Sequence, residues 1–178
     1  MHKNDLLKQM QNCRNNLLFS LAAATVISTE ESHEILNKSS ANFGGFQFDC
    51  SQIPAILGNA QDRQIFIQEF VNHAFRALLK ESFELVKVYS NSTSQFRKFQ
   101  SFSSYYLHRL LRNAVSHDFI WDLKNTNGNF YHYLPLTWKD VEVTAQHHGT
   151  PVVLEHITYA HMWAISEETL SLADKTLN

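Results

Sequence analysis

The sequence has little cysteine and no excess of positive charge. Its 178 residues include only Cys13 and Cys50, with no closely spaced pair. A disulfide framework is therefore excluded, and a reducing, intracellular setting is expected. The 15 Lys and Arg residues are outnumbered by 17 Asp and Glu residues, which gives a net charge of −2 with His neutral. No global positive field draws the chain to nucleic acid, so any contact with RNA has to be local.

Long hydrophobic runs are also absent. The run over residues 17–27 is the only one that resembles the core of a secretory signal, and it is too short to span a bilayer. The residues before this run include Asp5 and several amides, which make the N-terminal region longer and more mixed in composition than that of a secretory signal. A buried helix is therefore favoured over a cleaved signal. We therefore expect a cytoplasmic protein with no membrane contact.

Apolar residues are plentiful and follow helical spacings. The hydrophobic fraction is 44% with 13 Phe, and the length predicts a single globular domain over 1–178. The first helical segment is expected to break near Thr29. Two shorter pieces are expected, an extended segment at 46–48 and a helical turn at 54–57. The main predicted helices cover residues 3–37, 61–90, 94–114 and 153–175.

The pattern changes between the last two predicted helices. Asn127-Gly128 is a hairpin signal, and residues 134–138 and 141–144 look extended. A small β-hairpin or three short strands is therefore expected as an insertion over about 130–152. Because long helices with short connections pack as bundles, the fold predicted for the chain is an all-α four-helix bundle with this insertion before the last helix.

The segment Arg112-Asn113-Ala114-Val115-Ser116-His117 carries the strongest chemical signal. Metal-free cleavage of RNA needs a base that works near neutral pH, and His, with an unperturbed pKa of about 6.5, suits this role. It also needs a permanent cation that donates two parallel hydrogen bonds to the phosphate, which Arg provides. Arg112 and His117 form such a pair, so the sequence predicts phosphate-ester chemistry on RNA without a cofactor or metal ion.

The spacing of the pair sets a geometric condition. Five residues along an α-helix advance by about 500°, which leaves the two side chains roughly 140° apart. The helix must therefore end or distort between Asn113 and Ser116 for the pair to converge. Ser116 is a suitable N-cap for a short helix over 117–123, which would place His117 at a helix N-terminus that favours a phosphate.

This segment resembles the HEPN superfamily, whose signature is an Arg, four to six residues, and a His. Asn113 matches the polar residue that commonly follows the Arg, while Phe119 stands where one branch of the superfamily carries Tyr. The resemblance implies a four-helix bundle and a homodimer with a composite site. It also implies a metal-independent endoribonuclease of toxin–antitoxin or antiviral systems, with a possible antitoxin partner and with Arg112, His117 and Asn113 in catalysis.

Further residues on the third predicted helix are candidates for RNA binding. His108 lies one turn before Arg112 and shares its face. A modest basic set comprises Arg97, Lys98 and Arg109, which either contact phosphate or form a solvated face. The aromatic series has helical spacing and is interpreted mainly as core; it comprises Phe96, Phe99, Phe102, Tyr105 and Tyr106.

Other interpretations of the same residues remain open. Arg112 can neutralise helix carbonyls and His117 can be an ordinary loop residue. An inactive HEPN-like module that binds RNA or a protein partner is the main rival, and a helical small-molecule-binding domain is a third. A zinc site is disfavoured because no cysteine or carboxylate trio accompanies the histidines that would form it, which are His147, His148, His156 and His161.

Overall fold

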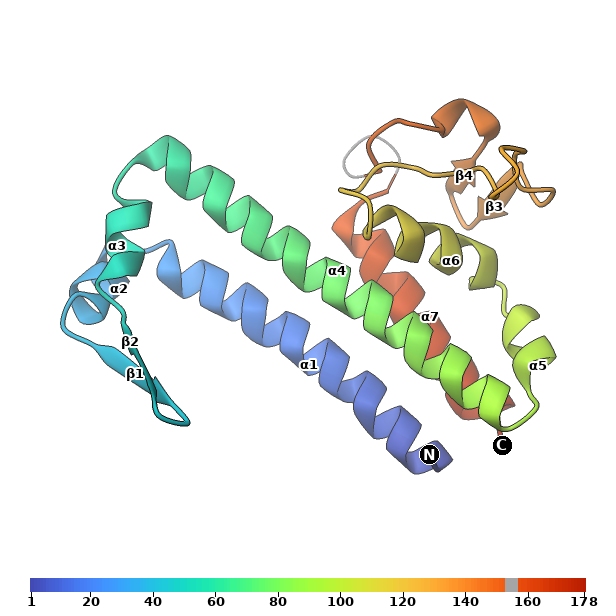
Figure 1. The fold of residues 1–178 in the computed structure, drawn as a ribbon, viewed down its shortest axis with the longest axis horizontal. Coiled ribbons are helices and arrows are strands. Elements are labelled where there is room, and N and C mark those ends of the chain that lie inside the picture. The colour runs from blue at the N-terminus through green and yellow to red at the C-terminus, as the bar shows by residue number, and fades with distance from the viewer. Residues whose placement is uncertain (153–156) are drawn as a thin grey trace. The chain divides into compact units, whose positions relative to one another are not determined.

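The computed structural model describes residues 1–152 and 157–178 (Figure 1). This part of the chain is mostly helical, with two small antiparallel hairpins. The helices are α1 (Lys3–Ile27), α2 (Glu30–Leu36), α3 (Gln52–Leu57), α4 (Ala60–Ser92), α5 (Phe96–Gln100), α6 (Tyr105–Ala114) and α7 (Tyr159–Thr176). The strands are β1 (Ser40–Phe43), β2 (Phe46–Asp49), β3 (Leu136–Trp138) and β4 (Val141–Val143), and a 3-10 turn η1 (Ala145–His147) follows β4.

The chain divides by packing into two compact units. The larger unit comprises Met1–Asn15 and Phe75–Asn178, and the smaller unit comprises Asn16–Ala74. Each unit therefore contains one part of the long helices α1 and α4. The residues expected to form a single domain over 1–178 are distributed over these two units.

The all-α, HEPN-like four-helix bundle expected from the sequence is not the fold that the chain adopts. Seven helices and two hairpins occupy the described residues, in place of four helices with one insertion. The helix predicted over 94–114 is interrupted between α5 and α6, where Ser101 Oγ donates to the carbonyl oxygen of Lys98 at 2.7 Å. Serine hydroxyls compete with the helix for backbone hydrogen bonds in this way, which explains why a helical apolar pattern did not yield one helix.

Helix boundaries agree with the sequence where a cap residue decides them. The predicted break near Thr29 is present, because Thr29 is extended and its side chain accepts a hydrogen bond from the Ser32 N–H to begin α2. The last helix begins later than expected, at Tyr159, after the extended cap residue Thr158. The start predicted for it at Val153 lies outside the described residues.

The larger unit has an aromatic core. The Phe99 ring lies between those of Phe83 and Tyr105, with centroid distances of 5.3 and 4.9 Å. Leu6 and Met10 of α1 and Ala173 of α7 pack in the same cluster. The aromatic series after residue 95 therefore serves mainly as core, as the sequence predicts.

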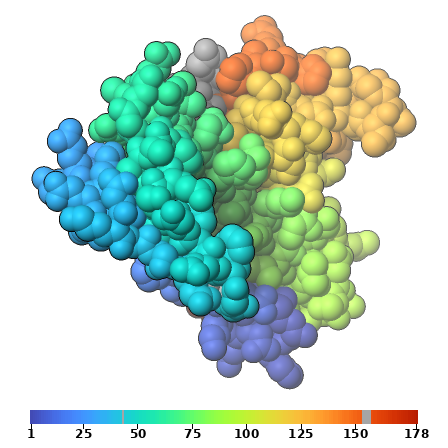
Figure 2. Space-filling model, turned by 60° about the vertical axis from the view of Figure 1, so that its left-hand side comes forward, coloured from blue at the N-terminus to red at the C-terminus, as the bar shows by residue number. Residues whose placement is uncertain are grey.

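The smaller unit has a sparser interior. Its hairpin pairs β1 with β2 in antiparallel register, Ser40 opposite Asp49, around a Gly44-Gly45 turn with positive φ at both residues. Several large apolar side chains remain exposed, among them Phe19 at 75% and Phe46 at 64%. In Figure 2 the residues from α2 to α3, coloured blue to cyan-green, form a continuous stretch of surface.

The segment between α6 and α7 belongs to the larger unit. Strands β3 and β4 pair with Leu136 opposite Val143, within the range where the sequence predicts a hairpin. An isolated bridge joins Lys124 to Phe130 around the predicted Asn127-Gly128 turn. The Trp138 indole N–H of β3 donates to the Glu168 carboxylate of α7 at 3.2 Å. None of the helices described here combines the length and apolarity that crossing a lipid bilayer requires.

Candidate functional site

Helix α6 presents its basic residues on one face. Leu107, Leu110 and Leu111 are buried, whereas Arg109 and Arg112 are partly exposed. Residues three and four positions apart share a helix face, so Arg109 lies beside Arg112 and Asn113. The same amphipathic pattern that seats α6 in the core thus gathers two guanidinium groups at the surface.

The Arg112 guanidinium is held by two neighbours. Its Nη2 lies 2.5 Å from Oε1 of Glu84 on α4, and its Nη1 donates to Asn113 Oδ1 at 3.0 Å. Its Nε is buried and makes no hydrogen bond with any described residue. Glu84 also pairs with Lys87 at 3.4 Å. Arg112 is therefore fixed in position, and one carboxylate is shared between two cations.

Helices α4, α5 and α6 enclose a shallow groove of about 340 Å³, which we call the cationic groove. Three cations line it from two helices, with the amides of Gln100 and Asn113 beside them. The Phe96 ring at the groove is partly exposed, whereas the Tyr105 ring is buried. Its lining residues are Phe83, Lys87, Phe96, Gln100, Tyr105, Arg109, Arg112 and Asn113.

His117 lies outside this groove. It is exposed in an irregular turn that follows α6, and the short helix predicted over 117–123 is absent. Asp118 and Phe119 both have positive φ, 55° and 57°. The buried Phe119 ring lies under the Arg76 guanidinium at 5.5 Å, so tertiary packing of this ring outweighs the local N-cap signal of Ser116. The structure places Arg112 in the groove and His117 in a solvent-exposed turn.

His108 is a core residue rather than a surface one. Its side chain is fully buried, with Nε2 3.0 Å from the Leu79 carbonyl oxygen and Nδ1 2.9 Å from Thr169 Oγ1. Because the carbonyl can only accept, Nε2 is the donor and Nδ1 carries the lone pair. This lone pair faces the Thr169 hydroxyl, whose single proton is also donated to the Ile165 carbonyl oxygen at 2.8 Å. Burial lowers the pKa of His108 to about 4. Both ring nitrogens are occupied, so the phosphate contact expected for His108 is not accessible to a ligand.

The remaining predicted RNA-binding residues take different places. Arg97 and Lys98 are exposed on α5 and do not line the cationic groove, and Lys98 Nζ donates to Gln95 Oε1 at 3.5 Å. Arg109 lines the groove and also lies over the Tyr131 ring, 5.3 Å from its centroid. Of the basic set, Arg109 is thus the one that the fold brings to Arg112.

The histidines weighed as zinc ligands have local backbone roles. The Thr144 N–H donates to His147 Nδ1 at 3.0 Å, and the Thr158 N–H donates to His161 Nδ1 at 3.1 Å. In both cases His takes the place of the Glu or Gln of a capping box. The predicted candidate His156 lies outside the described residues.

The two cysteines are free and buried. Burial raises the pKa of the Cys13 thiol to about 12, and the hydrogen bond that its Sγ donates to Glu81 acts in the same direction. Cys13 is therefore protonated and a poor nucleophile at neutral pH.

Sequence reasoning did not single out Glu84 and Lys87. The three-residue spacing from Glu84 to Lys87 is the only local signal of their pairing. That α4 faces α6 at this point depends on the larger unit's core and has no sequence signature.

No family model matches the sequence, and searches among curated proteins and solved structures found no match either. The cationic groove is therefore the main structural indication of a function.

Proposed function

We propose that the cationic groove binds single-stranded RNA and that the protein acts as an RNA-binding module. The observation that carries this proposal is the meeting of Lys87, Arg109 and Arg112 in one groove beside the partly exposed Phe96 ring. Cations that follow a backbone and aromatic rings on which bases stack are the two components of single-strand recognition. The net charge of −2 makes such a local set necessary.

The chemistry of each group suggests its role. Arg109 and Arg112 offer planar guanidinium groups for phosphate oxygens, and Lys87 adds a point charge. The amides of Gln100 and Asn113 can donate to and accept from a ribose 2′-hydroxyl, the group that distinguishes RNA from DNA. Arg97 and Lys98, exposed on the adjacent α5, extend the basic surface for a longer strand. This role fits a cytoplasmic protein.

A metal-independent ribonuclease of HEPN type is the second candidate. It is favoured by the hydrogen bond that joins Arg112 to Asn113, since these are the first two residues of the motif. In this function Arg112 would stabilise the transition state and His117 would act as base or acid. Because His117 does not line the groove of its own chain, cleavage would require the composite site of a homodimer. A toxin–antitoxin or antiviral role, with an antitoxin partner, would depend on this activity.

One titration tests the proposal. We expect a labelled mixed-sequence single-stranded RNA to bind the wild type in EDTA, measured by fluorescence anisotropy. Lys87→Gln and Arg109→Gln should each weaken binding about tenfold, because each removes a charge-assisted phosphate contact worth on the order of 1.5 kcal/mol. Lys175→Gln is the matched control, since Lys175 is exposed on α7 and does not line the groove.

The outcomes separate the two candidates. Absence of binding, or equal losses in Lys87→Gln and Lys175→Gln, would contradict RNA binding at this groove. The bound RNA should remain intact on a denaturing gel. If the wild type instead cuts the RNA in EDTA, and Arg112→Ala and His117→Ala both abolish cutting, the ribonuclease is the correct assignment.

A further inference from the structure

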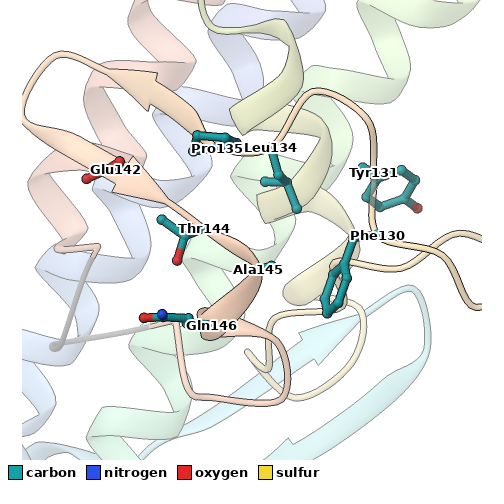
Figure 3. A pocket seen from close by; sticks show the side chains of 8 residues that line it. All are labelled: Phe130, Tyr131, Leu134, Pro135, Glu142, Thr144, Ala145 and Gln146. Carbon is teal, nitrogen blue, oxygen red and sulfur yellow. The ribbon is translucent and has the colours of Figure 1, made fainter.

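A second hollow lies in the segment between α6 and α7, within the larger unit (Figure 3). Its volume is about 410 Å³, within the range of roughly 300–1,000 Å³ typical of small-molecule sites. Phe130, Leu134 and Pro135 form its apolar wall, and Thr144 and Gln146 provide polar groups. Figure 3 shows the Leu134 and Phe130 side chains on one side of the hollow and Thr144 and Gln146 on the other.

Two residues that line this hollow, Phe130 and Tyr131, form cation–ring pairs. The Lys124 Nζ lies over the Phe130 ring, 5.0 Å from its centroid, and the Arg109 guanidinium lies over the neighbouring Tyr131 ring at 5.3 Å. Arg109 lines the cationic groove, whereas Tyr131 lines the hollow. The contact between Arg109 and Tyr131 therefore links a residue of the cationic groove to a residue of the hollow.

The composition of the hollow decides which part of a nucleotide it accepts. No cation is among its lining residues, and Glu142 contributes a carboxylate, so a phosphate is disfavoured. The Phe130 side chain is 44% exposed and offers a ring for stacking. The Thr144 hydroxyl and the Gln146 amide can both donate and accept, as the edge of a nucleobase requires.

We propose that this hollow holds one unstacked base of the RNA strand whose phosphates lie in the cationic groove. The inference rests on the proposed function and adds a base-binding site to it. Lys124 and Arg109 then contact the phosphates on either side of the bound nucleotide.

Photocrosslinking locates the base directly. An oligouridine that carries 4-thiouridine is bound to the full-length protein and irradiated, and the crosslinked peptides are identified by mass spectrometry. We expect crosslinks within residues 130–135. Phe130→Leu should weaken binding of the same RNA about tenfold, since it removes the aromatic ring on which the base stacks. Phe46→Leu is the matched control, because Phe46 is 64% exposed in the smaller unit.

The failures of the two proposals are distinguishable. If the wild type binds no RNA, both are overturned. A second outcome is that Lys87→Gln weakens binding, crosslinks occur only within residues 96–113, and Phe130→Leu binds like the wild type. This outcome supports RNA binding at the cationic groove and contradicts the base site. If Phe130→Leu fails to fold, as judged by circular dichroism, the positions of the crosslinks in the wild-type protein show whether the base binds in the hollow.

Discussion

His108 and His117 come from one stretch of chain and meet opposite environments. His117 is exposed in a turn, whereas His108 is buried between Leu79 and Thr169. The same residue type is thus a candidate for chemistry at one position and a structural component at the other. Burial is the property that separates them, and burial depends on what packs against α6.

The depressed pKa of His108 predicts an acid-sensitive fold. A buried neutral histidine whose pKa is lowered to about 4 binds fewer protons than the unfolded chain, in which its pKa is about 6.5. Its contribution to stability is therefore complete above pH 6.5 and is lost as the pH falls toward 4. We expect the free energy of unfolding, measured with urea, to fall by roughly 3 kcal/mol across this range through His108.

Two variants check the assignment. His108→Gln can still donate to the Leu79 carbonyl, and it should lose most of the dependence on pH between 6.5 and 4 while being less stable at pH 7.5. His117→Gln is the matched control, because it replaces an exposed histidine of the same segment. Equal pH dependence in His108→Gln and the wild type would show that another group titrates.

At the scale of elements, the cationic groove depends on how α4 faces α6. Glu84 on α4 pairs with Arg112 across the two helices and with Lys87 one turn later on its own helix. The Glu84 and Arg112 side chains are 31% and 30% exposed, so the pair is partly solvated and its contribution to stability is modest, on the order of 1 kcal/mol. Glu84 positions Arg112 but also reduces the positive charge that faces a ligand.

Removing this carboxylate should therefore strengthen RNA binding. We expect Glu84→Gln to bind single-stranded RNA a few-fold more tightly at low salt, with the gain reduced at high salt by screening. Fluorescence anisotropy against salt concentration measures both effects. Glu34→Gln makes the same change of charge at an exposed position of α2 and should bind like the wild type. Weaker binding by Glu84→Gln would show that fixing Arg112 matters more than the local charge.

At the scale of the whole molecule, the two units differ in interior and in charge. The larger unit contains the aromatic core, the cationic groove and the hollow. The smaller unit has few buried side chains and is acidic, with only Lys38 and Arg63 as basic residues. Its carboxylates are Glu30, Glu31, Glu34, Asp49, Asp62 and Glu69. The proposed RNA binding is therefore assigned to the larger unit, which contains the cationic groove.

The sparse interior of the smaller unit predicts unequal local stability. Backbone amides exchange through local opening where few apolar contacts hold an element in place. We expect the amides of α2, α3 and the β1–β2 hairpin to exchange with deuterium sooner than those of α6 and α7, as measured by mass spectrometry on the intact chain. Equal protection of both units would mean that the smaller unit is stabilised by more than its buried side chains.

The sequence alone determined the features that depend on local periodicity and caps. The apolar spacing of residues 61–90 predicted α4, and the cap residue Thr29 separated α1 from α2 as expected. The Asn127-Gly128 signal marked a turn, and the aromatic series after residue 95 was correctly interpreted as core. These features depend on the helical and turn preferences of residues that are neighbours in the sequence, so they can be predicted from the sequence alone.

Tertiary structure decided which residues meet. The positive φ of Phe119 and the burial of His108 follow from packing against distant elements. The short helix at 117–123 was therefore wrongly predicted, and so was the bundle. The pairing of Arg112 with Glu84 likewise spans two helices, and the approach of Arg109 to Tyr131 joins α6 to a loop. The sequence identifies candidate residues for a site, but contacts between elements determine which of them come together. The distance between two residues that are far apart in the sequence is not fixed until the core forms.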